Sequence, residues 1–174
     1  LFVNDANIAQ KIIVLAKSEE GPTCYIVDTD TAGIQISKIP SIAHENACEV
    51  VFDKVDISPE SQLGESGKGL DLLERIFSRT VVAKCAEMVG GCATALEMAA
   101  DYAKTRVQYG NPIGANQAIQ HYLADMKLTY DACLSFFYTT AWMIDQDQEA
   151  VKEISALKAM LNEGFNFITD RAVQ

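Results

Sequence analysis

The pattern of apolar and polar positions divides the chain into two unlike halves. Four short runs rich in β-branched and aromatic residues come first, and turn-forming stretches such as EEGP and TDTAG separate them. The runs cover residues 10–17, 22–28, 34–39 and 48–53. This spacing predicts an antiparallel meander or part of a barrel.

Later in the chain the apolar spacing changes to the helical period of 3.6 residues and keeps it to the end. The first helix is expected from about Leu70 to Val107, straight or kinked. Its pair Gly90 and Gly91 predicts a place where another backbone comes close. After a corner of glycine and proline, Asn116 should cap the second helix.

The second helix carries apolar residues on more than one side. One stripe comprises Ile119, Tyr122, Leu123, Met126, Tyr130, Cys133 and Phe137, and a second set comprises Leu128, Leu134, Phe136 and Trp142. A third helix, from about Glu149, has Ile154, Leu157, Leu161, Phe165 and Ile168 at bundle spacing. A helix covered on several sides is typical of proteins that oligomerise.

The predicted fold class is therefore α+β. A partial antiparallel β-barrel or meander occupies residues 1–64, and an up-and-down bundle of long helices occupies residues 65–174. The chain begins without methionine, at LFVNDA, in what reads as the middle of an element. We expect it to be a piece of a longer protein.

Composition and charge exclude several classes of protein. With 174 residues, of which 49% are apolar and 22% charged, the chain has enough material for a core and is not disordered. Its net charge of −10 opposes binding to nucleic acid. No apolar run approaches the roughly 20 residues that cross a bilayer, so no membrane span is expected.

Cysteine and histidine usage argues against disulfides and metals. The five cysteines, Cys24, Cys48, Cys85, Cys92 and Cys133, form no CxxC pair. We expect reduced, buried thiols in the cytoplasm of a bacterium or the mitochondrial matrix, with Cys85 and Cys92 in a core. Neither His44 nor His121 has a second ligand at metal spacing, so no metal site is predicted.

The stretch YAKTRVQYGNPIGANQAIQHYLADM, residues 102–126, joins the first two helices and resembles a family signature. With GKGLDLLERIF, AEMVGG and the closing ITDRAVQ, it looks like the C-terminal half of the acyl-CoA dehydrogenases. The segments LFVNDANIAQ, CYIVDTDTAGIQI and VVFDKVDISPESQLG look like the second part of that family's middle β domain. The resemblance covers essentially the whole chain.

The resemblance implies that the corner between the helices reaches FAD bound by a neighbouring subunit. The expected cofactor-binding residues are Arg106, Val107, Gln108, Tyr109, Asn116, Gln117 and Gln174. Arg106 would contact the pyrophosphate, which suits a planar, permanently charged guanidinium beside the free N–H groups of a helix start. The alternative is structural: Arg106 pairs with Asp101 or a helix-end carbonyl, and the amides cap helices.

The resemblance also implies a substrate side and a reaction. Phe77, Ser78, Arg79, Thr80 and Val81 align with a turn beside the CoA pantetheine and the acyl chain, and Ser18 resembles a serine near the CoA. Several relatives have arginine where this chain has Val81. The implied reaction is α,β-dehydrogenation of an acyl-CoA, with hydride transfer to FAD and reoxidation by electron-transfer flavoprotein.

No catalytic residue is assigned within the 174 residues. In most of the family the glutamate base lies beyond the equivalent of residue 174, and in some members it lies where this chain has Thr80. The expected assembly is a homotetramer. Three alternatives stay open: an acyl-CoA oxidase, a non-catalytic partner subunit of the same fold, or a helical oligomerisation module without catalysis.

Overall fold

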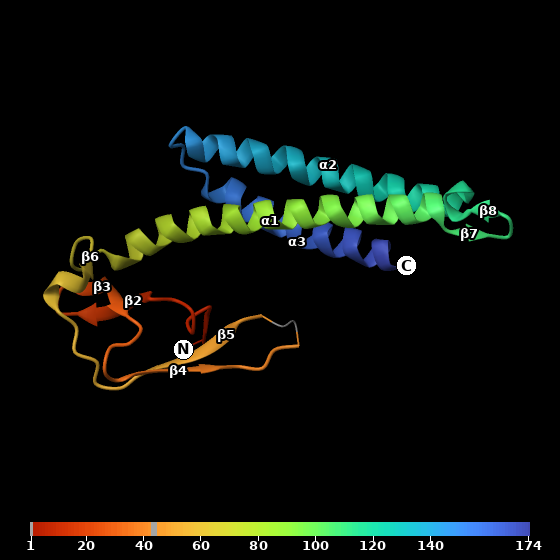
Figure 1. The fold of residues 1–174 in the computed structure, drawn as a ribbon. Helices are drawn as coiled ribbons and strands as arrows, with labels where there is room; N and C mark the ends of the chain where they lie inside the picture. The colour runs from red at the N-terminus through yellow and green to blue at the C-terminus, as the bar shows by residue number, and fades with distance from the viewer. Residues whose placement is uncertain (1, 43–44) are drawn as a thin grey trace. The chain divides into compact units, whose positions relative to one another are not determined.

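The computed structural model of the chain describes residues 2–42 and 45–174. These residues form two compact units, Leu1–Arg75 and Ile76–Gln174. Helix α1 (Gly69–Thr105) begins in the first unit and continues into the second (Figure 1). The predicted domain boundary between residues 64 and 65 stays a prediction.

The first unit contains two three-stranded antiparallel sheets. One has the order β1 (Phe2–Asn4), β5 (Ala47–Phe52), β4 (Ile34–Lys38), and the other β2 (Lys11–Ser18), β3 (Gly21–Asp28), β6 (Gln62–Leu63). The four predicted strands match β2, β3, β4 and β5 to within one residue at each end. The described residues form a partial β structure, without a closed barrel.

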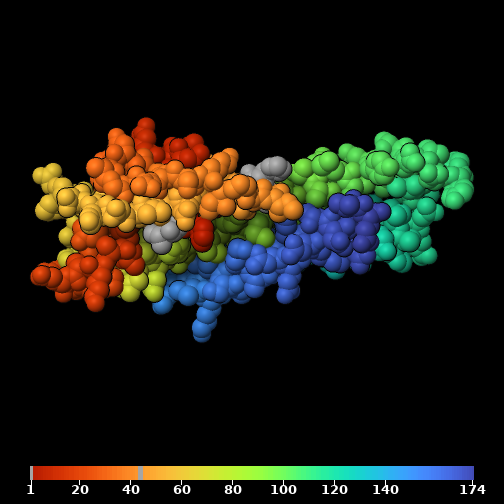
Figure 2. All heavy atoms as spheres, turned by 90° about the horizontal axis from the view of Figure 1, so that it is seen from below, coloured from red at the N-terminus to blue at the C-terminus, as the bar shows by residue number. Residues whose placement is uncertain are grey.

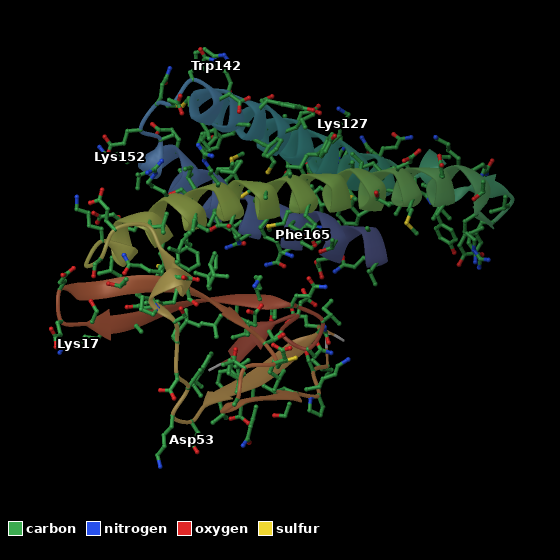
Figure 3. All side chains as sticks on the ribbon, turned by 60° about the vertical axis from the view of Figure 1, so that its left-hand side comes forward. Lys17, Asp53, Lys127, Trp142, Lys152 and Phe165 are labelled. Carbon is green, nitrogen blue, oxygen red and sulfur yellow. The ribbon has the colours of Figure 1, made fainter. Side chains whose placement is uncertain are left out.

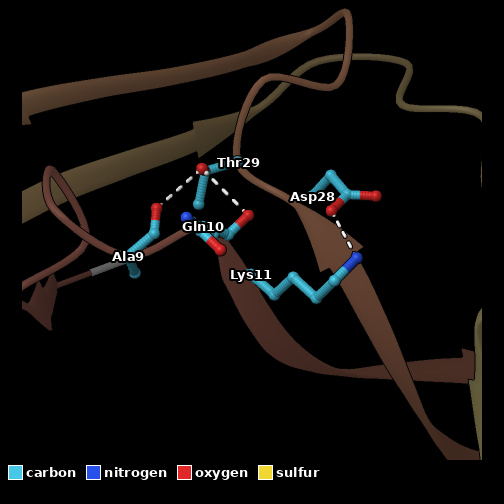
Figure 4. A network of polar contacts seen from close by, with 5 residues as sticks. All are labelled: Ala9, Gln10, Lys11, Asp28 and Thr29. Carbon is cyan, nitrogen blue, oxygen red and sulfur yellow. Dashed lines mark hydrogen bonds and ion pairs between the residues drawn. The ribbon is translucent and has the colours of Figure 1, made fainter.

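The hairpin of β2 and β3 has the longest register, from Lys11 opposite Asp28 to Ser18 opposite Gly21. At its open end, Lys11 pairs with Asp28, and the hydroxyl of Thr29 donates to the carbonyls of Ala9 and Gln10 at 2.8 and 3.2 Å (Figure 4). Exposed residues alternate with half-buried ones along β2, because successive side chains of a strand point to opposite faces, although residues 12–16 are all apolar.

The core of the first unit joins the two sheets. Ala6, Cys48 and Val50 are buried, and Ile12 of β2 packs against them with Val3, Ile34, Ile36 and Phe52. Because Ile12 comes from one sheet and its partners mainly from the other, apolar side chains hold the sheets together.

The second unit is a helical bundle of the rest of α1 with α2 (Gln117–Asp145) and α3 (Val151–Val173). Its central cluster takes Cys85 and Val89 from α1, Cys133 from α2, and Leu157 and Leu161 from α3. The predicted stripe on α3 is confirmed, because Ile154, Leu157, Leu161 and Ile168 are buried and Phe165 is half-buried. The α+β fold class is confirmed.

Two glycines allow the helices to pack closely. A Cβ on Gly91 of α1 would lie 2.7 Å from the ring of Phe165, a side chain labelled on α3 in Figure 3, and a Cβ on Gly164 would lie 2.9 Å from Sγ of Cys133. The prediction that another backbone comes close to this glycine pair is therefore wrong for the described chain. Gly90 faces open space, and Gly91 meets an aromatic side chain, not a backbone.

The residues of the second apolar set on α2 differ in burial. Leu134 and Phe136 pack against the central cluster, whereas Leu128 and Trp142 are exposed. Figure 3 shows Trp142 on the outer side of α2. Within the described residues, the three helices are too polar to cross a membrane.

Candidate functional site

The corner between α1 and α2 is a small, closed piece of structure. Helix α1 ends at Thr105, two residues before the predicted end, and Val107–Gln108 (β7) pairs with Asn111–Pro112 (β8). The two turn residues between these strands, Tyr109 and Gly110, both have positive φ, 51° and 83°. Two left-handed residues make the tight hairpin that matches the twist of its strands. The sequence analysis missed this hairpin.

The corner is locked onto the end of α1. The amide of Ile113 donates to the carbonyl of Arg106 at 2.8 Å, and the amide of Arg106 donates to the carbonyl of Tyr102 at 2.8 Å. Gly114, in the 3-10 turn Ile113–Ala115 (η2), would bring a Cβ within 2.9 Å of the Ala103 carbonyl oxygen. Only glycine leaves room for this approach.

The predicted cofactor residues of the corner are all exposed: Arg106, Val107, Gln108, Tyr109, Asn116 and Gln117. Arg106 has no ion pair with any acidic side chain in the described residues, and the carboxylate of Asp101 pairs instead with Lys104 at 2.9 Å. The structure thus does not provide the Asp101 pair, one of the two partners that the structural alternative offers Arg106.

Asn116 occupies the position before α2, as predicted, but the prediction of a side-chain cap is wrong. Its side chain makes no capping hydrogen bond, and the backbone carbonyl of Asn116 accepts from the amide of Gln120 at 3.1 Å. The side chain of Gln120 donates to the Gly114 carbonyl at 2.9 Å. The first N–H groups of α2, around Gln117, are therefore not covered by the Asn116 amide.

The far end of α3 brings Gln174 to a cavity of about 110 Å³ that also reaches the corner. The cavity is lined by Ala99, Tyr102, Ala103, Ile113, Ile119, Tyr122, Leu123, Met126 and residues 171–174. Figure 2 shows the blue end of α3 bordering the green atoms of the corner region. Residues about 60 positions apart in sequence, such as Ile113 and Gln174, thus line one site.

Sequence reasoning missed two members of this site, Arg171 and Tyr122. The guanidinium of Arg171 lies 4.7 Å from the ring centroid of Tyr122 and 5.6 Å from that of Phe167. Tyr122 belongs to an apolar stripe, which indicated only core packing. The signal in the sequence was a cation, Arg171, three residues before the predicted cofactor contact Gln174.

The predicted substrate residues on α1 have mixed environments. Phe77, Arg79 and Thr80 are exposed, and the hydroxyl of Thr80 donates to the Ile76 carbonyl at 2.9 Å. Ser78 is half-buried. Val81 packs against two buried clusters, so its side chain already has an apolar role.

Ser18, the remaining predicted substrate residue, belongs to a polar network in the first unit. Its hydroxyl donates to the Gly21 carbonyl at 2.8 Å and lies 3.1 Å from the hydroxyl of Thr23. Thr23 is fully buried and accepts from the amide of Gly67 at 2.8 Å. This network fastens the loop before α1 to the β2–β3 turn.

The cysteines are buried free thiols, as predicted. Burial raises the pKa of the Cys24, Cys85 and Cys133 thiols, and burial next to Cys133 raises the pKa of Cys92 to about 11. In residues 2–42 and 45–174, no three His, Cys, Asp or Glu side chains gather as metal ligands. His44 lies outside the described residues.

Comparison with known proteins identifies the family in which this arrangement of helices occurs. Residues 67–174 match the family model "Acyl-CoA dehydrogenase, C-terminal domain". The chain is 29% identical over 171 residues to an L-prolyl-[peptidyl-carrier protein] dehydrogenase of a Serratia species, covering 94% of this chain and 44% of that protein. It is 29% identical over 182 residues to an acyl-CoA dehydrogenase of Bacillus subtilis, covering 100% and 46%.

Solved structures agree with the sequence comparisons. Butyryl-CoA dehydrogenase from Megasphaera elsdenii superposes with a TM-score of 0.94 at 27% identity, covering 100% of this chain and 48% of that one. A structure titled "PigA with FAD and proline" gives 0.92 at 28% identity, covering 98% and 47%. The chain thus spans a little under half the length of these relatives. Because the family model covers more than half of the chain, the protein belongs to the acyl-CoA dehydrogenase family.

Proposed function

We propose that the protein is a flavin-dependent dehydrogenase of acyl thioesters, and that its helical corner holds part of the FAD. The observation that carries this proposal is Arg106, an exposed guanidinium at a helix end without an acidic partner in the described residues. Family membership and the relative solved with FAD support the choice of cofactor.

The residues of the corner fit the group. Arg106 offers fixed, permanently charged donors for phosphate oxygens, and the start of α2 adds N–H groups that the Asn116 side chain does not cap. The lining of the small neighbouring cavity includes Ile113, Ile119 and Met126, which offer apolar surface against which part of the cofactor can pack. When bound, FAD would supply the acceptor for a hydride from the substrate.

The roles of the other residues follow from their positions. Val107 and Gln108 offer the backbone and amide of a rigid hairpin, and Tyr109 at its tip is free to pack against the cofactor. Asn116 and Gln117 place amides at the start of α2, and Gln174 places one at the cavity. These residues orient the cofactor and exclude water from it.

We place the substrate thioester along Phe77, Ser78, Arg79, Thr80 and Val81 of α1. A role for Ser18, in the first unit, stays a separate prediction. Phe77 and Val81 offer apolar surface for an acyl chain. Thr80 supplies no general base, because a neutral threonine hydroxyl is too weakly basic to take the α-proton, and its own proton is donated to the Ile76 carbonyl.

Two thioester carriers are candidates. An acyl-CoA is the first, and the relative that acts on a peptidyl-carrier protein favours a carrier-bound thioester as the second. Turnover of butyryl-CoA and of a prolyl-loaded carrier protein with the same artificial electron acceptor would separate the two. Activity only with the loaded carrier protein would overturn the acyl-CoA assignment.

We also propose a homotetramer that passes electrons to electron-transfer flavoprotein. The exposed Leu128, Tyr138 and Trp142 leave apolar surface on α2 for another subunit. Light scattering on the flavin-loaded protein tests the assembly, and a monomer with tightly bound FAD contradicts it. Rapid reoxidation of the reduced protein by oxygen would favour an oxidase, and an absence of flavin absorbance would favour a non-catalytic helical module.

The deciding experiment is an FAD titration of Arg106→Ala. Loss of a charge-assisted contact costs about 1.5–3 kcal/mol, so the affinity for FAD should fall by roughly one to two orders of magnitude. Arg106→Lys should recover only part, because lysine lacks the planar fork. The variant should also lose thermal stability, because a smaller fraction of it carries bound FAD. Excess FAD should therefore restore most of that stability.

A matched control removes a neighbouring cation. Lys104→Ala breaks only the exposed pair with Asp101, which is worth under about 1 kcal/mol, and should leave FAD affinity unchanged. If Arg106→Ala behaves like Lys104→Ala, Arg106 has no contact with the cofactor and the proposed site is wrong.

A further inference from the structure

Arg171, on the last turn of α3, is a half-buried cation held between two aromatic rings. Its guanidinium is 4.7 Å from the Tyr122 centroid and 5.6 Å from the Phe167 centroid, both within the range of cation–π attraction. It forms no ion pair in the part of the chain that the structure describes. Because Tyr122 belongs to α2, this stacking ties the end of α3 to the start of α2 beside the cavity.

The same guanidinium contacts the carboxamide of Gln174. Nη1 of Arg171 donates to Oε1 of Gln174 at 3.3 Å, and Nε2 of Gln174 donates to Oδ2 of Asp170 at 3.4 Å. Arginine can only donate and a carboxylate can only accept, so the two neighbours recognise opposite ends of the amide. A flipped amide would face donor with donor and acceptor with acceptor.

We propose that Arg171 is a positioning residue that sets the orientation of the Gln174 carboxamide toward FAD. The stacking on Tyr122 fixes the guanidinium, and the guanidinium fixes which end of the amide is the oxygen. One N–H of Gln174 and one lone pair of its oxygen then stay available at the cavity for the cofactor. This inference rests on the proposed FAD site.

The test combines FAD affinity with a measurement on the cofactor-free protein. Arg171→Met keeps an unbranched apolar stem for Tyr122 but removes the charge and the donors, and should weaken FAD binding about 2- to 5-fold. Arg171→Lys should lie between Arg171→Met and the parent. The side-chain amide signals of Gln174 in NMR spectra, assigned with Gln174→Glu, should move toward free-glutamine positions in Arg171→Met without any cofactor.

A double-mutant cycle separates positioning from a merely structural role. If Arg171 acts through Gln174, Gln174→Ala should weaken FAD binding less in the Arg171→Met background than in the parent. Arg75→Met, on an exposed arginine outside the site, is the matched control and should bind FAD like the parent.

The outcomes separate the role of Arg171 from the proposed function. An affinity of Arg171→Met equal to that of Arg75→Met, full additivity in the cycle, or unmoved Gln174 signals would overturn the role of Arg171 while the proposed function stands. Failure of the parent protein itself to bind FAD would overturn the proposed function, and the positioning role with it.

Discussion

The two units of the chain satisfy the hydrogen bonds of their backbones in different ways. In the first unit, backbone pairing between strands and one buried hydroxyl, that of Thr23, hold loops in place. In the second, the backbone bonds lie inside helices, and apolar side chains with two close glycine contacts decide how the helices meet. Loss of volume should therefore damage the second unit most, and loss of a single hydrogen bond should damage the first.

The largest effect is expected from Leu161→Ala in the helical unit. Leu161 is 0% exposed and packs in the central cluster, so the free energy of unfolding should fall by about 2–5 kcal/mol. Leu128→Ala makes the same chemical change at a side chain that is 72% exposed, and should cost under about 0.5 kcal/mol. Urea denaturation of both variants measures the difference. Equal losses would show that this surface of α2 is buried in solution.

The next effect compares two fully buried threonines, one in each unit. Thr23→Val leaves the amide of Gly67 without its 2.8 Å acceptor, which should cost about 1–3 kcal/mol. The hydroxyl of Thr140 only donates to the Phe136 carbonyl of its own helix, so Thr140→Val should cost less. Denaturation of the two variants ranks them, and a larger loss for Thr140→Val would break the comparison.

A smaller effect concerns pH and the thiols of the helical bundle. Burial and the neighbouring Cys133 raise the pKa of Cys92 from 9.0 to about 11, so between these values the unfolded chain releases its thiol proton first. Stability from this group is complete below pH 9 and is lost as pH rises toward 11, by about 2 kcal/mol. Denaturation at pH 8, 9, 10 and 11 measures the loss.

Cys92→Ala is the control for the thiol titration, since it removes the group whose proton is at issue. Its stability should fall less steeply between pH 9 and 11 than that of the parent protein. The parent's thiols should also react slowly with Ellman's reagent at pH 8 and rapidly in denaturant, because all five are buried. An unchanged slope in Cys92→Ala would show that other groups cause the alkaline loss.

The smallest effect belongs to the one hairpin inside the helical unit. Tyr109 has a φ of 51°, a conformation that asparagine adopts more readily, so Tyr109→Asn should stabilise the protein by about 0.5–1 kcal/mol. If the exposed ring packs against FAD, the same variant should bind FAD more weakly. Thermal denaturation and an FAD titration of one sample give both numbers. Weaker FAD binding without a gain in stability would contradict the strain argument.

The sequence by itself determined the type and order of the main elements. Short runs rich in β-branched and aromatic residues, separated by turn-forming stretches, predicted β2, β3, β4 and β5, and the helical period predicted three helices with the buried stripe of α3. These patterns are strong because β-branched and aromatic residues favour strands, and because burial on one face repeats at about every third or fourth residue of a helix. The strands β1 and β6 and the corner hairpin were not predicted, since two or three residues are too few to form a recognisable run.

Only the tertiary structure decided which residues lie together around the candidate site. The sequence motif of the corner predicted Arg106 and its neighbours as cofactor-binding residues. Their roles toward FAD stay predictions. Periodicity cannot show that Arg171 of α3 stacks on Tyr122 of α2. It also could not tell that Gly91 meets Phe165 while Gly90 faces open space. These contacts depend on how two helices are rotated against each other, and a pattern along one helix carries no information about its neighbour.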